Sequence, residues 1–190
     1  ALYSVRKYVN EDTYITTPLV IDNNFPIIKS NPEIQVWDFN IKLYSDLIIE
    51  SGAQLTVTCK VIMPYQGKII VKPGGKLIVD GGTITTDSRN HLWQGIEVWG
   101  NSIQHQFTIN GQCYQGTVEL KNDALIENAY NAITLWHPGD YASMGGIVQA
   151  TKAHFKNNRK AIEFMSYNNF NPGNPTIQLN NFGFFSNCTF

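Results

Sequence analysis

The stretch that decides the fold is GKIIVKPGGKLIVDGGTITT, from Gly67 to Thr86. It holds two glycine pairs, Gly74-Gly75 and Gly81-Gly82, with an apolar run before, between and after them. No helix fits between turns that lie so close together, so the runs are predicted to be short strands joined by tight corners. We expect Gly74 and Gly81 to occupy corners where a side chain is poorly tolerated, with positive φ angles or close backbone neighbours.

Apolar residues alternate with polar ones along almost the whole chain, which is typical of half-buried strands. The segment LIIESGAQLTV (47–57) also aligns with IIVKPGGKLIV (69–79) at a shift of 22 residues, from 47 to 69. A repeat of this length cannot bury a core alone, so successive repeats must stack on one another. Like residues lie over like residues only if the strands run parallel, which predicts a coil of strands.

Two further series of repeats follow. The first shares a small residue, then Ile, any residue and a large apolar residue: GIEVW (95–99), AITLW (132–136) and AIEFM (161–165). Equivalent positions in this series are expected to stack in two internal columns: Ile96, Ile133 and Ile162, and Val98, Leu135 and Phe164. The second series is interpreted as a strand followed by an Asn corner: ALIEN (124–128), AHFKN (153–157) and GFFSN (183–187).

These repeats predict an all-β fold, a parallel β-helix (solenoid), over residues 38–190. Residues 1–37 repeat less clearly and hold three prolines, so we expect an N-terminal cap over the first turn, with a strand near 16–21. A β-sandwich is the rival fold, but its hairpin turns of the Asn-Gly type occur once, at Asn110-Gly111. The pattern at the C-terminus predicts that the turns continue beyond Phe190 in a larger parent protein.

The composition argues against several classes of partner and cofactor. A net charge of −1 and a pI near 6.5 do not favour nucleic acid or an anionic membrane surface. No apolar run approaches the ~20 residues of a membrane-spanning helix, so no membrane insertion is expected. The three cysteines lack the spacing of a zinc site and are interpreted as three buried thiols, with one disulfide and a free thiol as the alternative. No metal or other cofactor is predicted.

The motifs KPGGKLIVDGGT (72–83) and WQGIEVWG (93–100), with IVQATKAHFKNNRKAIEF (147–164) and FFSNCTF (184–190), carry a family resemblance. They resemble bacterial secreted and cell-surface right-handed parallel β-helix proteins of the pectate-lyase-like superfamily, of the kind exported by type IX secretion. The resemblance covers roughly residues 38–190 and implies a right-handed coil and a secreted or cell-surface location. Such proteins include polysaccharide lyases, glycoside hydrolases, adhesins and stalks, so the fold leaves the function open.

Groups that could cleave a polysaccharide are dispersed along the chain. Hydrolysis needs two carboxyls that converge on one bond, and only Glu97 and Glu163 hold equivalent outward positions. A lyase needs a calcium-binding acidic cluster and a basic group, but no acidic cluster accompanies the basic corner at Arg159 and Lys160. Catalytic residues therefore stay unassigned.

The aromatic residues give a stronger signal, because Trp and Tyr rings stack on the apolar faces of sugars. Trp99 and Trp136 hold the same repeat position and are expected on the same side of the coil. The glycan-binding candidates are Trp93, Trp99, Trp136, Tyr130 and Tyr141. The competing interpretation is packing, with Trp136 beneath the loop HPGDYASMGG (137–146).

The sequence predicts a non-catalytic extracellular module that acts as a structural stalk or as a glycan-binding, adhesive surface. Its expected partner is an extracellular polysaccharide. The alternative is a polysaccharide-degrading enzyme of the β-helix type, either a lyase or a glycoside hydrolase.

Overall fold

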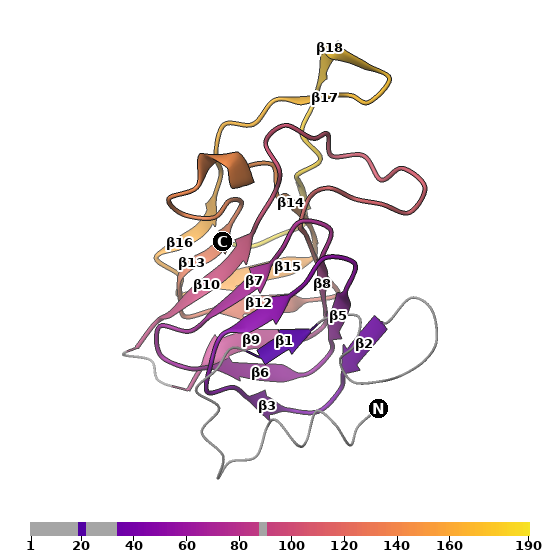
Figure 1. Ribbon diagram of the computed structural model, residues 1–190. Helices are drawn as coiled ribbons and strands as arrows, with labels where there is room; N and C mark the ends of the chain where they lie inside the picture. Colours follow the sequence, from indigo (N-terminus) through magenta and orange to yellow (C-terminus); the bar gives the residue numbers. More distant parts are fainter. Residues whose placement is uncertain (1–18, 22–33, 88–90) are drawn as a thin grey trace.

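The structure, a computed structural model, describes residues 19–21, 34–87 and 91–190, and its regular elements are β-strands apart from one short 3-10 helix (Figure 1). Three parallel sheets, A, B and C, make up the body. Sheet A contains β1 (Leu19–Ile21), β4 (Leu47–Ile49), β7 (Lys68–Val71), β10 (Trp93–Val98), β13 (Ala129–Thr134) and β16 (Lys160–Glu163). Sheet B contains β2 (Ile34–Trp37), β5 (Gln54–Val57), β8 (Lys76–Asp80), β11 (Thr117–Lys121), β14 (Ile147–Thr151) and β19 (Phe184–Ser186). Sheet C contains β3 (Ile41–Lys42), β6 (Lys60–Met63), β9 (Thr83–Thr86), β12 (Ala124–Glu127) and β15 (Ala153–Lys156).

From β2 to β16 the chain visits the sheets in a fixed order, B then C then A, and each return adds one strand to the same sheet. Figure 1 follows this stacking from indigo strands at one end to orange and yellow strands at the other. The predicted all-β stack of parallel strands is therefore confirmed, and its connectivity is that of a β-helix-like solenoid. Two small elements lie outside the sheets: the antiparallel hairpin β17 (Asn169–Asn171) with β18 (Asn174–Leu179), and the 3-10 helix η1 (Tyr141–Ser143).

The register confirms the repeats inferred from the sequence. Leu47 pairs with Ile69, and Val57 pairs with Val79, at the predicted shift. In sheet A, Ile133 pairs with Ile96 on one side and with Ile162 on the other, which confirms the first internal column. Inward residues of successive turns thus stack like on like, and together they form one continuous apolar core.

The second column is confirmed for its first two members and wrong for the third. Val98 and Leu135 are buried, but the Phe164 side chain is 58% exposed. Phe164 follows β16, the last strand of sheet A among the described residues, so no further strand of that sheet covers it here. Its ring instead meets Phe185 edge to face.

The third member assigned to the Asn-corner series is also wrong. ALIEN and AHFKN form β12 and β15 in sheet C, but GFFSN forms β19, which pairs with β14 in sheet B. The equivalent of AHF is the segment Cys188–Phe190, because Thr189 bridges to His154 and the Phe190 ring stacks on Phe155. Asparagines in the left-handed conformation occur at both corners, at Asn128 and Asn157 after sheet C and at Asn187 after sheet B. An Asn therefore indicates a corner but does not distinguish the corner after sheet B from the corner after sheet C.

The glycine corners are as expected. Gly74 and Gly81 have φ angles of 81° and 70°. A Cβ on Gly75 would lie 2.8 Å from the Glu50 carbonyl oxygen, and one on Gly82 would lie 2.7 Å from that of Val57. In each pair, the first glycine therefore has a left-handed φ, and a Cβ on the second would clash with the backbone of the preceding turn of the solenoid.

Two strands that fall within the predicted cap belong to the parallel sheets. β1 pairs with β4, and β2 pairs with β5. The rest of the cap, residues 1–18 and 22–33, lies outside the described residues, as does the start of the strand predicted near 16–21.

Among the described residues, the connections from sheet A to sheet B are short early in the chain and long later, and this asymmetry positions the candidate sites. Those after β4 and β7 are short turns, at 50–53 and 72–75, whereas those after β10, β13 and β16 span 99–116, 135–146 and 164–183. The corners between sheets B and C stay tight throughout, as at 81–82 and 152. The long connections therefore gather along one corner of the solenoid, and in Figure 1 the hairpin β17–β18 projects beyond the stacked strands.

The three cysteines carry free thiols and are half-buried, so no disulfide links them. Burial raises the pKa of the Cys59 thiol to about 11, which leaves it protonated at neutral pH. In the part of the chain that the structure describes, no helix has the length and apolar character needed to cross a membrane.

Replacing Ile133 with Asp should lower the free energy of unfolding by about 3 to 5 kcal/mol, because the change buries an unpaired charge in the middle of a column. Ile103, which lies exposed in the 99–116 connection, provides the matched control. Ile103→Asp should change stability by no more than about 0.5 kcal/mol. Urea unfolding measures both, and equal effects at the two positions would contradict the assignment of Ile133 to the core.

Replacing Lys152 with Gly should stabilise the fold by about 0.5 kcal/mol or more, because Lys152 holds a left-handed φ of 51° that costs a residue with a Cβ. Lys156→Gly is the control, since Lys156 is also exposed but lies in strand β15, where glycine weakens the strand. Thermal unfolding should therefore move in opposite directions for the two variants. A loss of stability in Lys152→Gly would show that the corner does not strain this residue.

Candidate functional site

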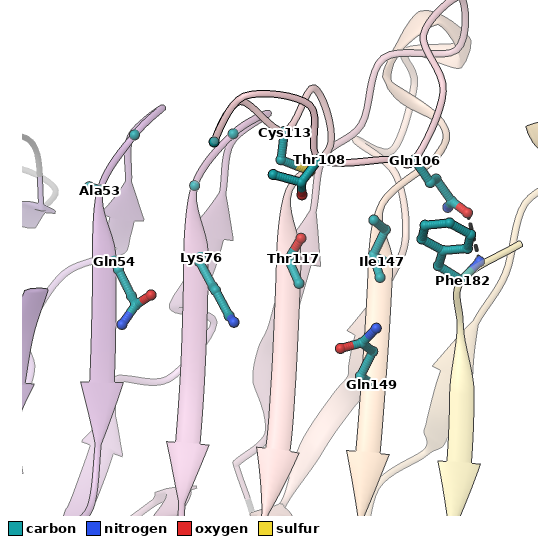
Figure 2. Close-up of a pocket in the computed structure, with 14 residues that line it drawn as sticks. Ala53, Gln54, Lys76, Gln106, Thr108, Cys113, Thr117, Ile147, Gln149 and Phe182 are labelled. Atoms are coloured by element: carbon teal, nitrogen blue, oxygen red, sulfur yellow. Dashed lines mark hydrogen bonds between the residues drawn. The ribbon is translucent and has the colours of Figure 1, made fainter. Parts of the chain in front are cut away.

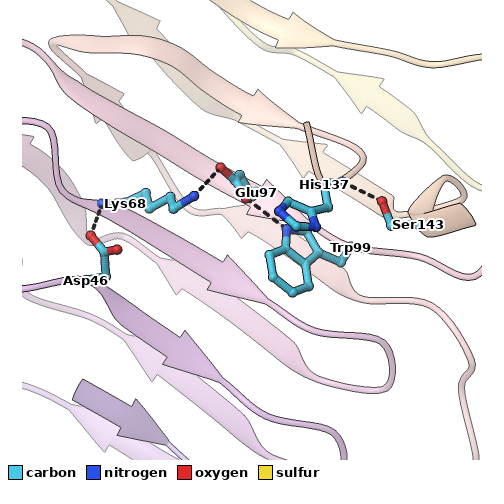
Figure 3. A network of polar contacts seen from close by, with 6 residues as sticks. All are labelled: Asp46, Lys68, Glu97, Trp99, His137 and Ser143. Carbon is cyan, nitrogen blue, oxygen red and sulfur yellow. Dashed lines mark hydrogen bonds and ion pairs between the residues drawn. The ribbon is translucent and has the colours of Figure 1, made fainter. Parts of the chain in front are cut away.

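A chain of polar contacts crosses the outer face of sheet A (Figure 3). The Lys68 backbone N–H donates to Asp46 Oδ1 at 2.9 Å, and Lys68 Nζ pairs with Glu97 Oε1 at 2.9 Å. Trp99 Nε1 donates to Glu97 Oε2, also at 2.9 Å. Glu97 and Trp99 are two residues apart and so share the outward face, while Val98 between them points into the core.

Four rings continue from the end of this chain, and we call Trp99, Trp136, His137 and Tyr141 the aromatic cluster. The His137 ring stacks on Trp99 with centroids 4.2 Å apart and an interplanar angle of 22°. The Tyr141 ring stacks on Trp136 with centroids 5.3 Å apart and an angle of 30°. Trp136 and His137 are neighbours in the chain, so the same connection contributes to both stacks. Trp99 directly follows strand β10, and the 135–146 connection after β13 supplies the other three rings.

The 135–146 connection is fixed by its own hydrogen bonds. The His137 N–H donates to Ser143 Oγ at 2.7 Å, and that hydroxyl donates to the Asp140 carbonyl at 2.7 Å. Asp140 caps η1 by accepting from the Ala142 N–H at 3.0 Å. The Gly100 N–H donates to the Ser143 carbonyl, which ties this connection to the segment after Trp99. The rings are therefore held before any ligand arrives.

The two stacks differ in what they offer to solvent. Tyr141 is 65% exposed and forms the outer layer. Beneath it, the Nε1 atom of Trp136 is buried without a hydrogen-bond partner. Trp136 therefore supports the loop, and Tyr141 presents the open ring. Trp99 and Trp136 both follow equivalent strands, as expected, but the ring that stacks on Trp99 is His137. Histidine spacing alone did not identify His137, although its place directly after Trp136 was a usable signal.

The other two candidates lie elsewhere. Trp93 is 0% exposed, and its Nε1 donates to the Glu127 carbonyl at 2.9 Å, so its ring packs inside the solenoid and offers no face to a ligand. Tyr130 is partly exposed near the start of β13, whereas the aromatic cluster lies beyond the end of that strand. The Arg159 guanidinium lies over the Tyr130 ring at 4.5 Å from its centroid and donates to its hydroxyl. Tyr130 thus forms a separate pair.

The two carboxylates at equivalent outward positions do share a row. Glu97 pairs in register with Thr134, which pairs with Glu163, so the backbones of the two acids lie two strand spacings or ~9.6 Å apart. Both carboxylates are already engaged: Glu97 binds Lys68 and Trp99, and Glu163 binds Lys160 and Asn131 at 2.9 and 3.1 Å. Among the described residues, no group of three or more His, Cys, Asp or Glu is placed to hold a metal ion.

A hollow lies on a different face of the solenoid, over sheet B. It is a groove of about 370 Å³ between the outer face of the strands and the 99–116 connection. Sequence reasoning missed it, because the polar residues of its floor occupy ordinary outward strand positions. The usable signal was the long connection after Trp99, which interrupts otherwise tight repeats.

The chain matches no family model, no curated protein sequence and no solved structure. The resemblance to exported β-helix proteins therefore stays a prediction that depends on the repeat motifs. What can be inferred about function comes from the side chains of the aromatic cluster, from the two carboxylates Glu97 and Glu163, and from the groove.

Trp136→Ala should lower the free energy of unfolding by about 2 kcal/mol, less than the ~3 to 5 kcal/mol of a fully buried Trp, because its ring is only half-buried. Tyr141→Ala should cost less than about 1 kcal/mol, since that ring forms the outer layer. Urea denaturation of both variants measures the difference. Equal small losses would mean that Trp136 does not anchor the 135–146 connection.

Proposed function

We propose that this chain is a non-catalytic, extracellular module that binds glycans through the aromatic cluster. The observation that carries the proposal is the two ring stacks, His137 on Trp99 and Tyr141 on Trp136, with Tyr141 exposed. Flat aromatic faces match the C–H faces of sugar rings, and polar groups beside them select the hydroxyl pattern. Glu97 and Lys68 supply such polar groups next to Trp99.

The site is suited to binding because it is formed in advance. Hydrogen bonds within 137–143 and the ion pair of Lys68 with Glu97 fix the rings and the polar groups together. Folding has already ordered these groups, so glycan binding costs less conformational entropy. Tyr141 is the natural contact for a sugar face, and the stack of His137 on Trp99 offers a second aromatic pair.

The solenoid would present this site as a rigid stalk or adhesive surface. We propose a right-handed coil, since connections between parallel strands of one sheet are right-handed in about 98% of cases. A secreted or cell-surface location is part of the same proposal and is supported by the resemblance of the repeats to exported β-helix proteins. An extracellular polysaccharide is the ligand class that fits both.

A polysaccharide-cleaving enzyme is the second candidate, favoured by the shared row of Glu97 and Glu163. Acid–base cleavage needs one carboxyl to give a proton and another to act as base or nucleophile. Here Lys68 already engages Glu97, and Lys160 engages Glu163, so neither carboxylate is free to act on a sugar. Release of reducing sugar from a bound polysaccharide, lost in Glu97→Gln, would favour the enzyme and would contradict the non-catalytic proposal.

Tyr141→Ala should weaken binding to an extended polysaccharide by roughly 1 to 3 kcal/mol, the usual range for a stacking anchor. Tyr65→Ala is the matched control, because Tyr65 is similarly exposed but lies in the turn between β6 and β7. A glycan array identifies the ligand, and calorimetry then gives the affinity of each variant. Unchanged affinity in Tyr141→Ala, with the melting temperature also unchanged, would exclude the aromatic cluster as the site.

A further inference from the structure

We propose that the groove over sheet B is a second glycan site, which takes a neutral, extended sugar chain laid across the strands. The proposal shares with the proposed function only the class of ligand; its residues and its face of the solenoid are different. The groove has a volume of about 370 Å³ and is bounded by sheet B on one side and by the 99–116 connection on the other.

The floor of the groove is a row of outward side chains in register. Gln54 on β5 pairs with Lys76 on β8, which pairs with Thr117 on β11. Thr117 pairs with Ile147 on β14, and Gln149 lies two residues further along the same face of that strand. Figure 2 places these side chains on neighbouring strands, with Thr108 and Cys113 on the loop above Thr117. A polymer that crosses the strands therefore meets a new side chain at every step.

The spacing of this row selects the kind of polymer. Stacked strands are ~4.8 Å apart, which is close to the length of one pyranose unit, whereas an extended peptide advances only ~3.3 Å per residue. The repeat of a glycan chain can therefore match the spacing of the strands, whereas the repeat of an extended peptide does not. Amide and hydroxyl groups, as on Gln54, Thr117 and Gln149, are the partners that sugar hydroxyls use.

The charge of the lining selects a neutral chain. Among the described residues that line the groove, Lys76 is the charged one, and its Nζ lies 2.9 Å from Glu119 Oε2. Partial burial acts to raise the pKa of Glu119, but hydrogen bonds from Lys76 and Lys121 outweigh it and lower the pKa. The carboxylate is thus charged and cancels the ammonium of Lys76. A chain of acidic sugars would find no unpaired cation here.

The wall of the groove is built by a buried glutamine. Gln115 is fully buried, and its Oε1 accepts from the Asn101 N–H at 2.6 Å. Its Nε2 donates to the carbonyls of Asn101 and Gln104 at 3.0 and 2.8 Å. One side chain therefore fastens both ends of the segment 101–115 to each other.

A second buried amide fastens the wall to the neighbouring connections. The Phe182 N–H donates to Gln106 Oε1 at 2.7 Å, a contact drawn in Figure 2, and Gln106 Nε2 donates to the Gly145 carbonyl at 2.9 Å. The Gln106 N–H donates to Asn169 Oδ1 at 3.0 Å. All three long connections thus meet at Gln106. The groove is preformed, which lowers the ordering cost of a ligand.

The groove can be tested through Cys113, because this residue lines the groove and carries a free thiol. In a Cys59→Ser, Cys188→Ser background, Cys113 is the one cysteine left for maleimide to label. The labelling rate is measured with neutral β-linked hexasaccharides of glucose, xylose and mannose, and with hexagalacturonate as the acidic probe. We expect at least one neutral hexasaccharide to slow labelling and hexagalacturonate to leave the rate unchanged.

Variants then separate the two sites. Gln149→Ala should weaken this protection by about 3-fold to 10-fold, the effect of one lost hydrogen bond, while Tyr141→Ala should leave it unchanged. No protection by any neutral hexasaccharide, or protection by hexagalacturonate alone, would overturn the inference. Protection lost in Tyr141→Ala but kept in Gln149→Ala would also overturn it, and would leave the aromatic cluster as the site. If Gln149→Ala reduces the protection while Tyr141→Ala leaves the glycan affinity unchanged, the groove is supported as a glycan site. The same result would contradict the proposed function of the aromatic cluster.

Discussion

The constraint on which the structure depends is the register between successive parallel strands. Backbone hydrogen bonds fix each strand above its equivalent in the previous turn, so an inward residue can meet only an inward residue. The column through Leu47, Ile69 and Ile96 follows from that rule, as does the column through Leu55 and Leu77. So does the outward row in which Gln54, Lys76 and Thr117 lie side by side. Ion pairs such as Lys72 with Glu50 and Lys76 with Glu119 then link neighbouring turns on the outside. One ladder thus forms the core and the surface rows together.

The corners show how this scaffold separates stability from binding. The tight corners use residues in the left-handed conformation, such as Gly81 and Asn128, and they keep the turns in step. The connections from sheet A to sheet B carry no such limit on length, and they supply the aromatic cluster and the wall of the groove. Buried side chains such as Gln106, Gln115 and Ser143 hold these connections in place by hydrogen bonds to their backbone carbonyls. Long loops tied to a rigid scaffold are where binding groups are usually found.

Much of the scaffold could be predicted from the sequence, because inward apolar residues recur at fixed shifts and glycine pairs mark corners. The assignment of GFFSN failed, since two kinds of corner accept Asn and the sequence does not distinguish them. Among the binding candidates, Tyr141 is exposed and Trp99 is half-buried, but Trp93 packs inside, because the direction of an aromatic side chain beside a strand depends on the register. Contacts between distant segments, such as Gln106 with Asn169, leave no local pattern and could not be predicted.

The central claim is that the long connections, and the outward faces beside them, carry the binding surface of this chain. Amide chemical-shift mapping tests it most directly, with isotope-labelled protein titrated with the glycan that binds most tightly. The account predicts shifts that saturate with ligand and that cluster in 99–116 and 135–146, with smaller changes at Glu97 and Thr117. Shifts centred on sheet C, around Ile62, Thr83 and Leu125, would contradict it.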